Sequence, residues 1–236
     1  MNRALGCGFL FAALALAGCD MGHRVRTGPV QTEPVSVDLD QSEIVRARLK
    51  IAAGKLFIRG GATKLVDGTF TINVPSWLPK VTYDPSTFRG ILTIEQSGKG
   101  AAIGDLRNDW DLSFNNDKPL DLSIECGAGE ANLDLGSLNL RGLSVEIGAG
   151  KIDLDLRGAP KASYEARIEG GVGEATVHVP EDVGVSAEAR GGIGQIEVEG
   201  LRKDGDHYVN SHWDSAKVRV RLSVQGGIGH IHIISS

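Results

Sequence analysis

The chain has 236 residues, of which 41% are hydrophobic, so it is long enough to bury a substantial core. Its formal net charge of −5 at pH 7 argues against a nucleic-acid-binding protein, which would carry a basic face. With 32 glycines and 5% aromatic residues, the composition favours tight turns and thin aliphatic layers over a bulky helical core.

The N-terminus has the pattern of a signal peptide. Arg3 supplies a positive charge, and an apolar run of 14 residues follows from Ala4 to Ala17. This run is too short to span a bilayer comfortably, which favours a cleaved signal over a membrane helix. We therefore predict a signal peptide over residues 1–18.

The signal peptide closes with Leu16-Ala17-Gly18-Cys19, which resembles the lipobox of bacterial lipoproteins. The resemblance implies cleavage before Cys19 and acyl chains on its thiol, which would anchor the protein in a membrane of the cell envelope, facing the periplasm or the exterior. Asp20 is typical of lipoproteins retained in the inner membrane. An ordinary secretory signal with a chance cysteine is the alternative. Two or three acyl chains hold a protein far more firmly than one.

Residues 19–35 mix glycine, proline, threonine and charges without periodicity, which predicts a flexible tether after the acylated cysteine. Residues 36–236 are then one all-β domain, with an irregular part over 36–110 and regular repeats over 111–236. In the irregular part, Val45–Ile51 alternates as a strand does, and Ile51-Ala52-Ala53-Gly54 is a degenerate copy of a later repeat. Cys126 is expected to be a small core residue.

A Gly-x-Gly phrase recurs through the second half of the chain, at starting positions that differ by 21, 23, 21 and 35 residues. An alternating strand enters each copy and another leaves it, so one face is apolar. A fixed period near 21 predicts a β-solenoid or β-roll-like stack of two-strand repeats. The glycines expected to turn the chain are Gly127, Gly129, Gly148, Gly150, Gly171, Gly173, Gly192, Gly194, Gly227 and Gly229.

Two ligand-binding interpretations of this phrase fail. Phosphate-binding loops open a helix after their glycines, whereas a strand follows here each time. A calcium β-roll needs an oxygen ligand at the second residue after the phrase, and that position holds Ala131, Ile152, Ala175, Ile196 or Ile231. The phrase is therefore interpreted as architecture.

Several segments resemble the toast-rack family of bacterial envelope proteins, which is similar to the C-terminal domain of LiaF-type cell-envelope stress proteins. They are Asn108-Asp109-Trp110, Gly127-Ala128-Gly129-Glu130-Ala131, Gly148-Ala149-Gly150-Lys151 and Val179-Pro180-Glu181-Asp182-Val183. The resemblance covers residues 40 to 235. It implies a single stacked β domain at the envelope, without catalytic activity, and it supplies no catalytic residues. The chain lacks the multi-span membrane region of LiaF, so the regulatory role of that protein does not transfer directly.

Outward-facing acidic residues and histidines form a possible ladder if the repeats stack in register, since neighbouring strands lie about 5 Å apart. Its members are Asp134, Asp153, Asp155, His178, Glu197, His230 and His232. Such a ladder is either a solvated face, a cation site or a pair of sugar-cleaving carboxylates. His178, His230 and His232 could provide zinc ligands, because His-x-His on a strand places both rings on one face. We predict a solvated face, with no metal and no cofactor.

These features together predict a membrane-anchored lipoprotein that acts without catalysis, as a structural, adhesive or envelope-stress-sensing module. It would present its solenoid surface to an unknown envelope protein or glycan. The alternative is a carbohydrate-active β-helix lyase or hydrolase that uses the outward acidic residues. An enzyme would gather its polar and aromatic side chains in a cleft, and this sequence spreads them along the chain.

Overall fold

The computed structural model describes residues 25–98 and 102–236, and over these ranges the protein is almost entirely β-structure. This confirms the all-β class. The predicted signal peptide, Cys19 and Asp20 lie outside the described residues. The one helical segment within them is a 3-10 turn, η1 (Pro75–Trp77), whose Trp77 is buried. No helix in these ranges has the length and apolar character needed to cross a membrane.

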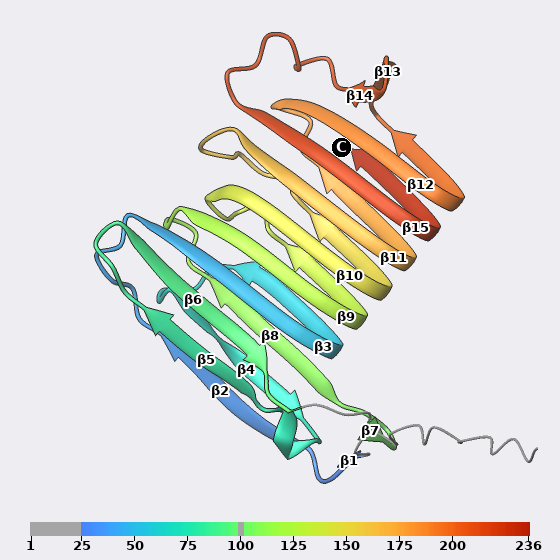
Figure 1. Cartoon of the computed structure of the whole chain (residues 1–236). Coiled ribbons are helices and arrows are strands. Elements are labelled where there is room, and N and C mark those ends of the chain that lie inside the picture. Colours follow the sequence, from blue (N-terminus) through green and yellow to red (C-terminus); the bar gives the residue numbers. More distant parts are fainter. Residues whose placement is uncertain (1–24, 99–101) are drawn as a thin grey trace, which may run out of the picture.

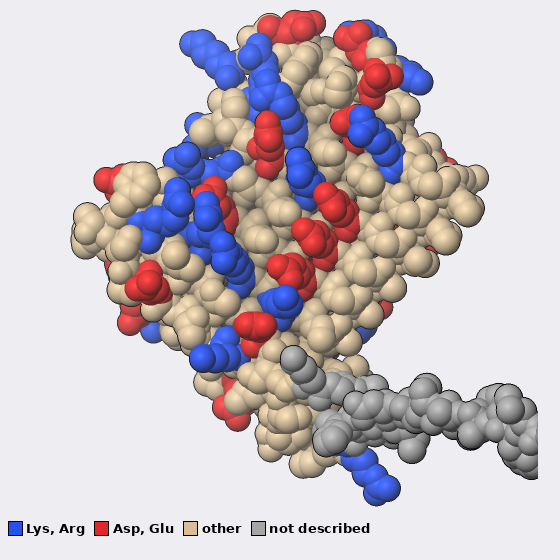
Figure 2. Space-filling model, in the orientation of Figure 1, with Lys and Arg blue, Asp and Glu red and all other residues tan. Residues whose placement is uncertain are grey.

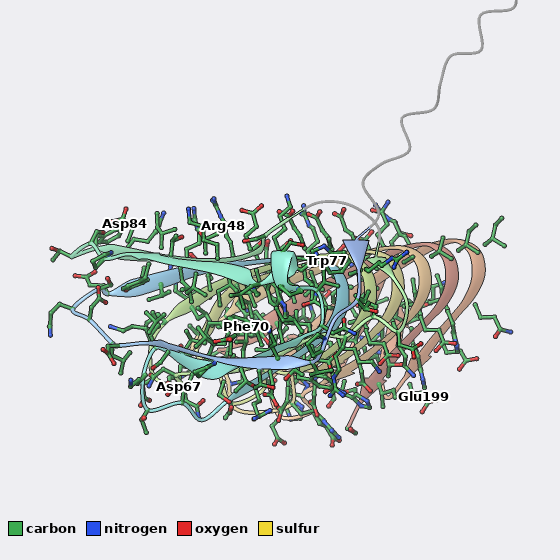
Figure 3. All side chains as sticks on the ribbon, turned by 90° about the horizontal axis from the view of Figure 1, so that it is seen from below. Arg48, Asp67, Phe70, Trp77, Asp84 and Glu199 are labelled. Carbon is green, nitrogen blue, oxygen red and sulfur yellow. The ribbon has the colours of Figure 1, made fainter. Side chains whose placement is uncertain are left out.

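Long bent strands make up most of the fold (Figure 1). Within the described residues, six strands of 15 to 17 residues each pass through a Gly-x-Gly phrase or its degenerate copy. They are β3 (Ile44–Gly60), β9 (Leu120–Asp134), β10 (Leu140–Asp155), β11 (Tyr164–Val179), β12 (Gly184–Glu199) and β15 (Arg219–Ser235). Seen along the stack, each strand folds back on itself, and its two arms lie in two layers with the core between them (Figure 3). The phrase therefore bends one continuous strand, and the connections between coils lie elsewhere.

The bend depends on the second glycine of each phrase. Gly150 has a φ of +139°, and a Cβ atom added there would lie 1.8 Å from the carbonyl oxygen of Gly129 in the next coil. Only glycine combines this backbone conformation with so close an approach. The first position of the phrase is less demanding at the end of the stack. An inner coil would meet another bent strand at this point. Ala52 instead donates its N–H to Oε1 of the Gln96 side chain, 2.9 Å away.

The bent strands pair in parallel and in exact repeat register. Gly54 is paired with Gly129 and Gly129 with Gly150, so the degenerate copy predicted at Ile51-Ala52-Ala53-Gly54 is confirmed as a true coil. Alternate side chains point between the two layers, and most of them are aliphatic. Cys126 belongs to this core as predicted, and burial raises the pKa of its thiol to about 11. Stacking in register joins the apolar positions of neighbouring coils into one buried strip, which no single coil could bury alone.

The spatial order of the coils departs from their order in the chain. The stack runs β3-β9-β10-β11-β15-β12, so the last strand is inserted between the two that precede it (Figure 1). The 35-residue spacing before the last phrase accommodates this excursion. Its polar segment forms a short hairpin of β13 (Arg202–Asp204) and β14 (His207–Val209), and β14 pairs with the first arm of β12.

The N-terminal end of the stack is closed by shorter strands. The first arm of β3 pairs with β6 (Arg89–Gln96) and its second arm with β8 (Asn108–Phe114), so two separate strands replace one bent strand. Antiparallel strands continue both layers: β5 (Pro79–Asp84) beside β6, and β4 (Val66–Ile72) then β2 (Gln31–Val37) beside β8. Short β1 (Val25–Arg26) pairs with β7 (Ala102–Ile103). Residues 31–35, which the sequence places in the tether, are therefore part of the sheet.

Candidate functional site

The predicted acidic ladder exists as rows of paired residues on the outer side of the second arms. Asp134, Asp155 and His178 are in register on β9, β10 and β11. Asp153 lies in the adjacent row, between Asn132 and Thr176. The stacking that brings these residues together is therefore as expected.

Asp155 is already engaged by a neighbouring cation. The Nε atom of Arg157 donates to both carboxylate oxygens of Asp155, at 3.0 Å each. Hydrogen bonding from Arg157 lowers the pKa of Asp155 against the opposing effect of burial. A carboxylate held in this way is a structural anion, and Asp134, Asp153 and Asp155 line none of the grooves described below.

The three histidines considered as possible zinc ligands do not form one set. His230 and His232 lie together on β15, with ring centroids 6.0 Å apart, but His178 is in register with Ile234, two residues beyond His232. The ligand atoms that do lie within 4.8 Å of one another come from Glu197, Glu199 and His232. His178 therefore lies apart from the other two candidate histidines, and the carboxylates of β12 lie nearer to His232.

A groove of about 810 Å³ crosses the outer side of the first arms, and the sequence interpretation did not anticipate it. Its floor is recessed where small residues face outward on β9, β10 and β15. Ser123, Ser144 and Ser223 stand four residues before the first glycine of their repeats, in a row that also contains Arg167 and Glu188. Aligning the repeats on their glycines would have shown that three of these five positions are serine.

The walls of the groove are charged and of both signs. They are formed by Arg46, Asp121, Glu165, Arg167, Glu188 and Arg221. At one end stands Trp213, whose ring lies 5.6 Å from the guanidinium carbon of Arg219 and 5.5 Å from that of Arg221. Serine hydroxyls, guanidinium groups and carboxylates together can both donate and accept hydrogen bonds.

The loop that carries Trp213 is fixed to the stack. Asn210 is buried; its Nδ2 donates to the carbonyl oxygens of Val183 (2.6 Å) and Glu181 (3.1 Å), and its Oδ1 accepts from the N–H of Val185. Nε of Arg219 donates to the carbonyl oxygen of Trp213 over 2.9 Å. The indole therefore has a fixed position at the rim of the groove.

Two further rows border the groove on the side of the bend (Figure 2). Glu125, Glu146 and Glu169 are in register on β9, β10 and β11 and form a line of acidic side chains, with Lys50 bonded to Glu125 at 3.0 Å. Beyond them the bend itself is an uncharged ridge formed by the middle residues of the phrases. The side chains on this ridge become larger toward the β12 end of the stack. Alanines are followed by Val172, Ile228 and Ile193, which are 53%, 52% and 71% exposed.

The architecture, with a bent parallel stack closed at one end by β2, β4, β5 and β6, has a counterpart among known protein families. A profile of the N-terminal domain of toast_rack (DUF2154) matches residues 26–178. The chain belongs to the toast-rack family. A second profile, for the C-terminal region of the cell wall-active antibiotics response protein LiaF, matches residues 128–233, the part that contains the repeats.

One solved structure is similar to this chain in both sequence and fold. A proposed cell adhesion protein from Clostridium sporogenes is 32% identical and has a TM-score of 0.85, covering 88% of this chain and 100% of its own. A proposed adhesin from Parabacteroides distasonis is 12% identical over 91% of this chain and 100% of its own, but its TM-score of 0.30 is too low to support an argument. No curated protein matches the chain. None of the descriptions of these toast-rack relatives names a reaction.

Proposed function

We propose that this protein is a non-catalytic adhesion module of the bacterial cell envelope, which binds an envelope glycan in the groove of its first arms. The groove is the observation that carries the proposal. It is built on strands that pair along their whole length, so its side chains are positioned before a ligand arrives, and such preorganisation lowers the entropic cost of binding. The Clostridium sporogenes relative, described as a proposed cell adhesion protein, supports the same class of function.

A glycan fits the lining better than an apolar ligand does. Outward serines leave room along the floor, charged side chains of both signs can hydrogen-bond to hydroxyl groups, and Trp213 offers an indole at one end. Strands at about 5 Å spacing present these groups at regular intervals, which suits a polymer of repeating units.

The proposed location rests on the lipobox-like segment. Acylation of Cys19 would hold the domain at the membrane, and Asp20 favours retention in the inner membrane. The Cys19→Ala chain should lose incorporation of a labelled fatty acid and move from the membrane fraction to the soluble fraction. An unchanged membrane fraction for this variant would refute the anchor.

The groove is tested by sedimentation of the purified chain with isolated cell-wall glycan. Ser144→Trp fills the floor of the groove and should abolish co-sedimentation, whereas Asn132→Trp, on the outer side of the second arm, should leave it unchanged. The melting temperature of both variants shows whether the fold persists. Equal co-sedimentation of both variants would contradict binding in the groove. If the chain instead binds an envelope fraction and loses that binding once the fraction is treated with protease, the ligand is a protein.

An envelope-stress-sensing role is the second candidate, favoured by the match of residues 128–233 to the LiaF C-terminal region. Sensing predicts that cells with the Ser144→Trp chain lose a transcriptional response to a cell wall-active antibiotic. A pure adhesion module predicts a normal response and weaker glycan binding.

A further inference from the structure

Two histidines and two glutamates gather at the open end of the stack, on the outer side of the second arms. His230 and His232 alternate on β15, so both imidazoles point outward, with their rings nearly parallel at 3°. Glu197, on the neighbouring β12, is paired in register with His232. Glu199 follows two residues later on the same strand. Figure 3 places Glu199 on the outer side of this layer.

The contacts within the cluster are short. Nε2 of His232 lies 3.0 Å from Oε1 of Glu199, and Nε2 of His230 lies 3.6 Å from Oε2 of Glu197. One ligand atom each from Glu197, Glu199 and His232 lies within 4.8 Å of the other two. Donors around a tetrahedral zinc ion, with bonds of about 2.1 Å, are about 3.4 Å apart. The cluster is therefore close to a coordination geometry without any movement of the backbone.

The glutamates have the freedom to complete that geometry. The side chains of Glu197 and Glu199 are 50% and 64% exposed, so small rotamer changes can bring their oxygens onto an ion. His232 is more enclosed, at 25% exposure, and its strand is paired on both sides. One fixed imidazole with two adjustable carboxylates is a suitable starting arrangement for a metal site.

The surroundings favour a cation. The positions paired with His230 are Glu174 and Gln195, and those paired with His232 are Thr176 and Glu197. None of these four is basic, and the nearest cation in the same row is Lys151, which pairs with Glu174 at 3.8 Å. Three carboxylates therefore surround two imidazoles, and a divalent ion would balance this local negative charge.

We propose that Glu197, Glu199 and His232 bind a divalent first-row transition-metal ion, with zinc as the reference ion. Imidazole and carboxylate donors suit such ions, and three protein ligands leave one position for water. His230 is a positioning residue. It is not among the residues whose ligand atoms lie within 4.8 Å of one another. Its Nε2 atom, which is buried without a hydrogen-bond partner among the described residues, lies 3.6 Å from the carboxylate of Glu197.

The site would also fasten the end of the stack. Its ligands come from β12 and β15, and the second arm of β12 is paired only with β15 among the described residues. A metal bridge between these two arms would stabilise the coil that has the fewest neighbours. Because an ion that binds only the folded state raises stability by mass action, metal should increase the melting temperature.

Isothermal titration of the purified, untagged chain with zinc chloride tests the proposal. We expect one ion per chain, together with a rise in the melting temperature. Glu199→Gln and His232→Ala should each weaken binding at least about tenfold. Glu199 is exposed, so its variant remains informative if His232→Ala proves unstable.

Two matched controls separate this site from general surface binding. His178→Ala removes a histidine from the neighbouring strand, and Glu146→Gln removes an exposed carboxylate from the first arm of β10, but neither residue belongs to the cluster. Both variants should bind zinc within about twofold of the unchanged chain, because neither residue supplies a ligand atom to the site. The proposal is overturned if no saturable binding occurs, or if the controls weaken binding as much as Glu199→Gln does.

Discussion

At the scale of single residues, the fold depends on backbone conformations that only glycine adopts, and their position within the phrase decides the cost of a substitution. Both glycines of an inner phrase approach a neighbouring coil: the oxygen of Gly127 would lie 2.4 Å from a Cβ at position 148, and that of Gly129 1.8 Å from one at position 150. The middle residue faces outward and varies freely from alanine to isoleucine. The sequence itself therefore records which positions tolerate a side chain.

This contrast gives a direct test. Gly150→Ala combines a strained φ with a backbone collision, and we expect it to lower the free energy of unfolding by at least about 2 kcal/mol. Ala149, one residue away, is paired with Val172 on the ridge, so valine is already present at this position in the next coil. Ala149→Val should therefore change the free energy of unfolding by less than about 0.5 kcal/mol. Denaturant unfolding of both variants measures the difference. Similar values for the two would refute the role assigned to the second glycine.

The thiol of Cys126 provides a second residue-scale prediction. Burial raises its pKa to about 11 in the folded chain, so at about pH 8.5 it is almost entirely neutral, whereas an unfolded thiol titrates near that pH. Alkylation at Cys126, followed by peptide mapping, should be slow in the native protein and fast in concentrated guanidinium. Because the folded chain keeps this proton while the unfolded chain releases it, the free energy of unfolding should fall as the pH rises from about 8.5 toward 11. Rapid alkylation of the native chain would show that the site is open.

At the scale of elements, the sequence predicted each coil well and their order less well. The period near 21 and the alternation around each phrase indicate the bent strands, because glycine spacing and binary pattern are local signals. The insertion of β15 between β11 and β12 has no such signal. All coils share one alternating apolar sequence pattern, so each can stack on any other. The long excursion through β13 and β14 lets the chain pass over its neighbour.

The same reasoning explains what was missed at the candidate sites. Alternation along the strand predicts that the side chains of His230 and His232 point outward. The partners of these residues, however, depend on which strands are neighbours and on their register. The groove likewise appears only when Ser123, Ser144 and Ser223 are brought together across the stack. Residues 31–35 looked like a tether because Pro34 and the flanking polar residues hide a strand whose side chains are mostly exposed.

Engineered disulfides test the order of the strands. Glu169 on β11 is paired with Gln225 on β15, and both are exposed, so Glu169→Cys with Gln225→Cys should cross-link on oxidation. Paired residues on adjacent strands are about 5 Å apart, within the range that a disulfide spans. Glu169→Cys with Arg190→Cys should not cross-link, because β15 separates β11 from β12. Mass spectrometry of the linked peptides distinguishes the two outcomes, and the opposite pattern would restore stacking in chain order.

At the scale of the whole molecule, the stack has two unlike ends. The N-terminal end is closed by antiparallel strands and by side chains that substitute for a missing bend. Asn108 is buried there; its Nδ2 donates to the carbonyl oxygen of Ala53 (2.6 Å), and its Oδ1 accepts from Nε1 of Trp110 (3.0 Å). At the other end, β14 covers only the first arm of β12, at Ser186 and Ala187. Stability is therefore expected to be unevenly distributed, as in other stacked proteins whose coils contact only their neighbours.

Hydrogen exchange should show this gradient directly. Peptides within residues 191–199, in the second arm of β12, are expected to exchange fastest among the bent strands, because among the described residues they pair with β15 alone and present their other edge to water. Peptides within residues 143–155 of β10 should exchange slowest, since β10 is paired on both sides along its length. Exposed edges invite association with other chains, and here the bend, Glu197 and Glu199 oppose it. If residues 191–199 were instead as protected as β10 in a chain shown to be free of metal, that edge would have to be covered in solution by a second molecule, and dilution should then restore its exchange.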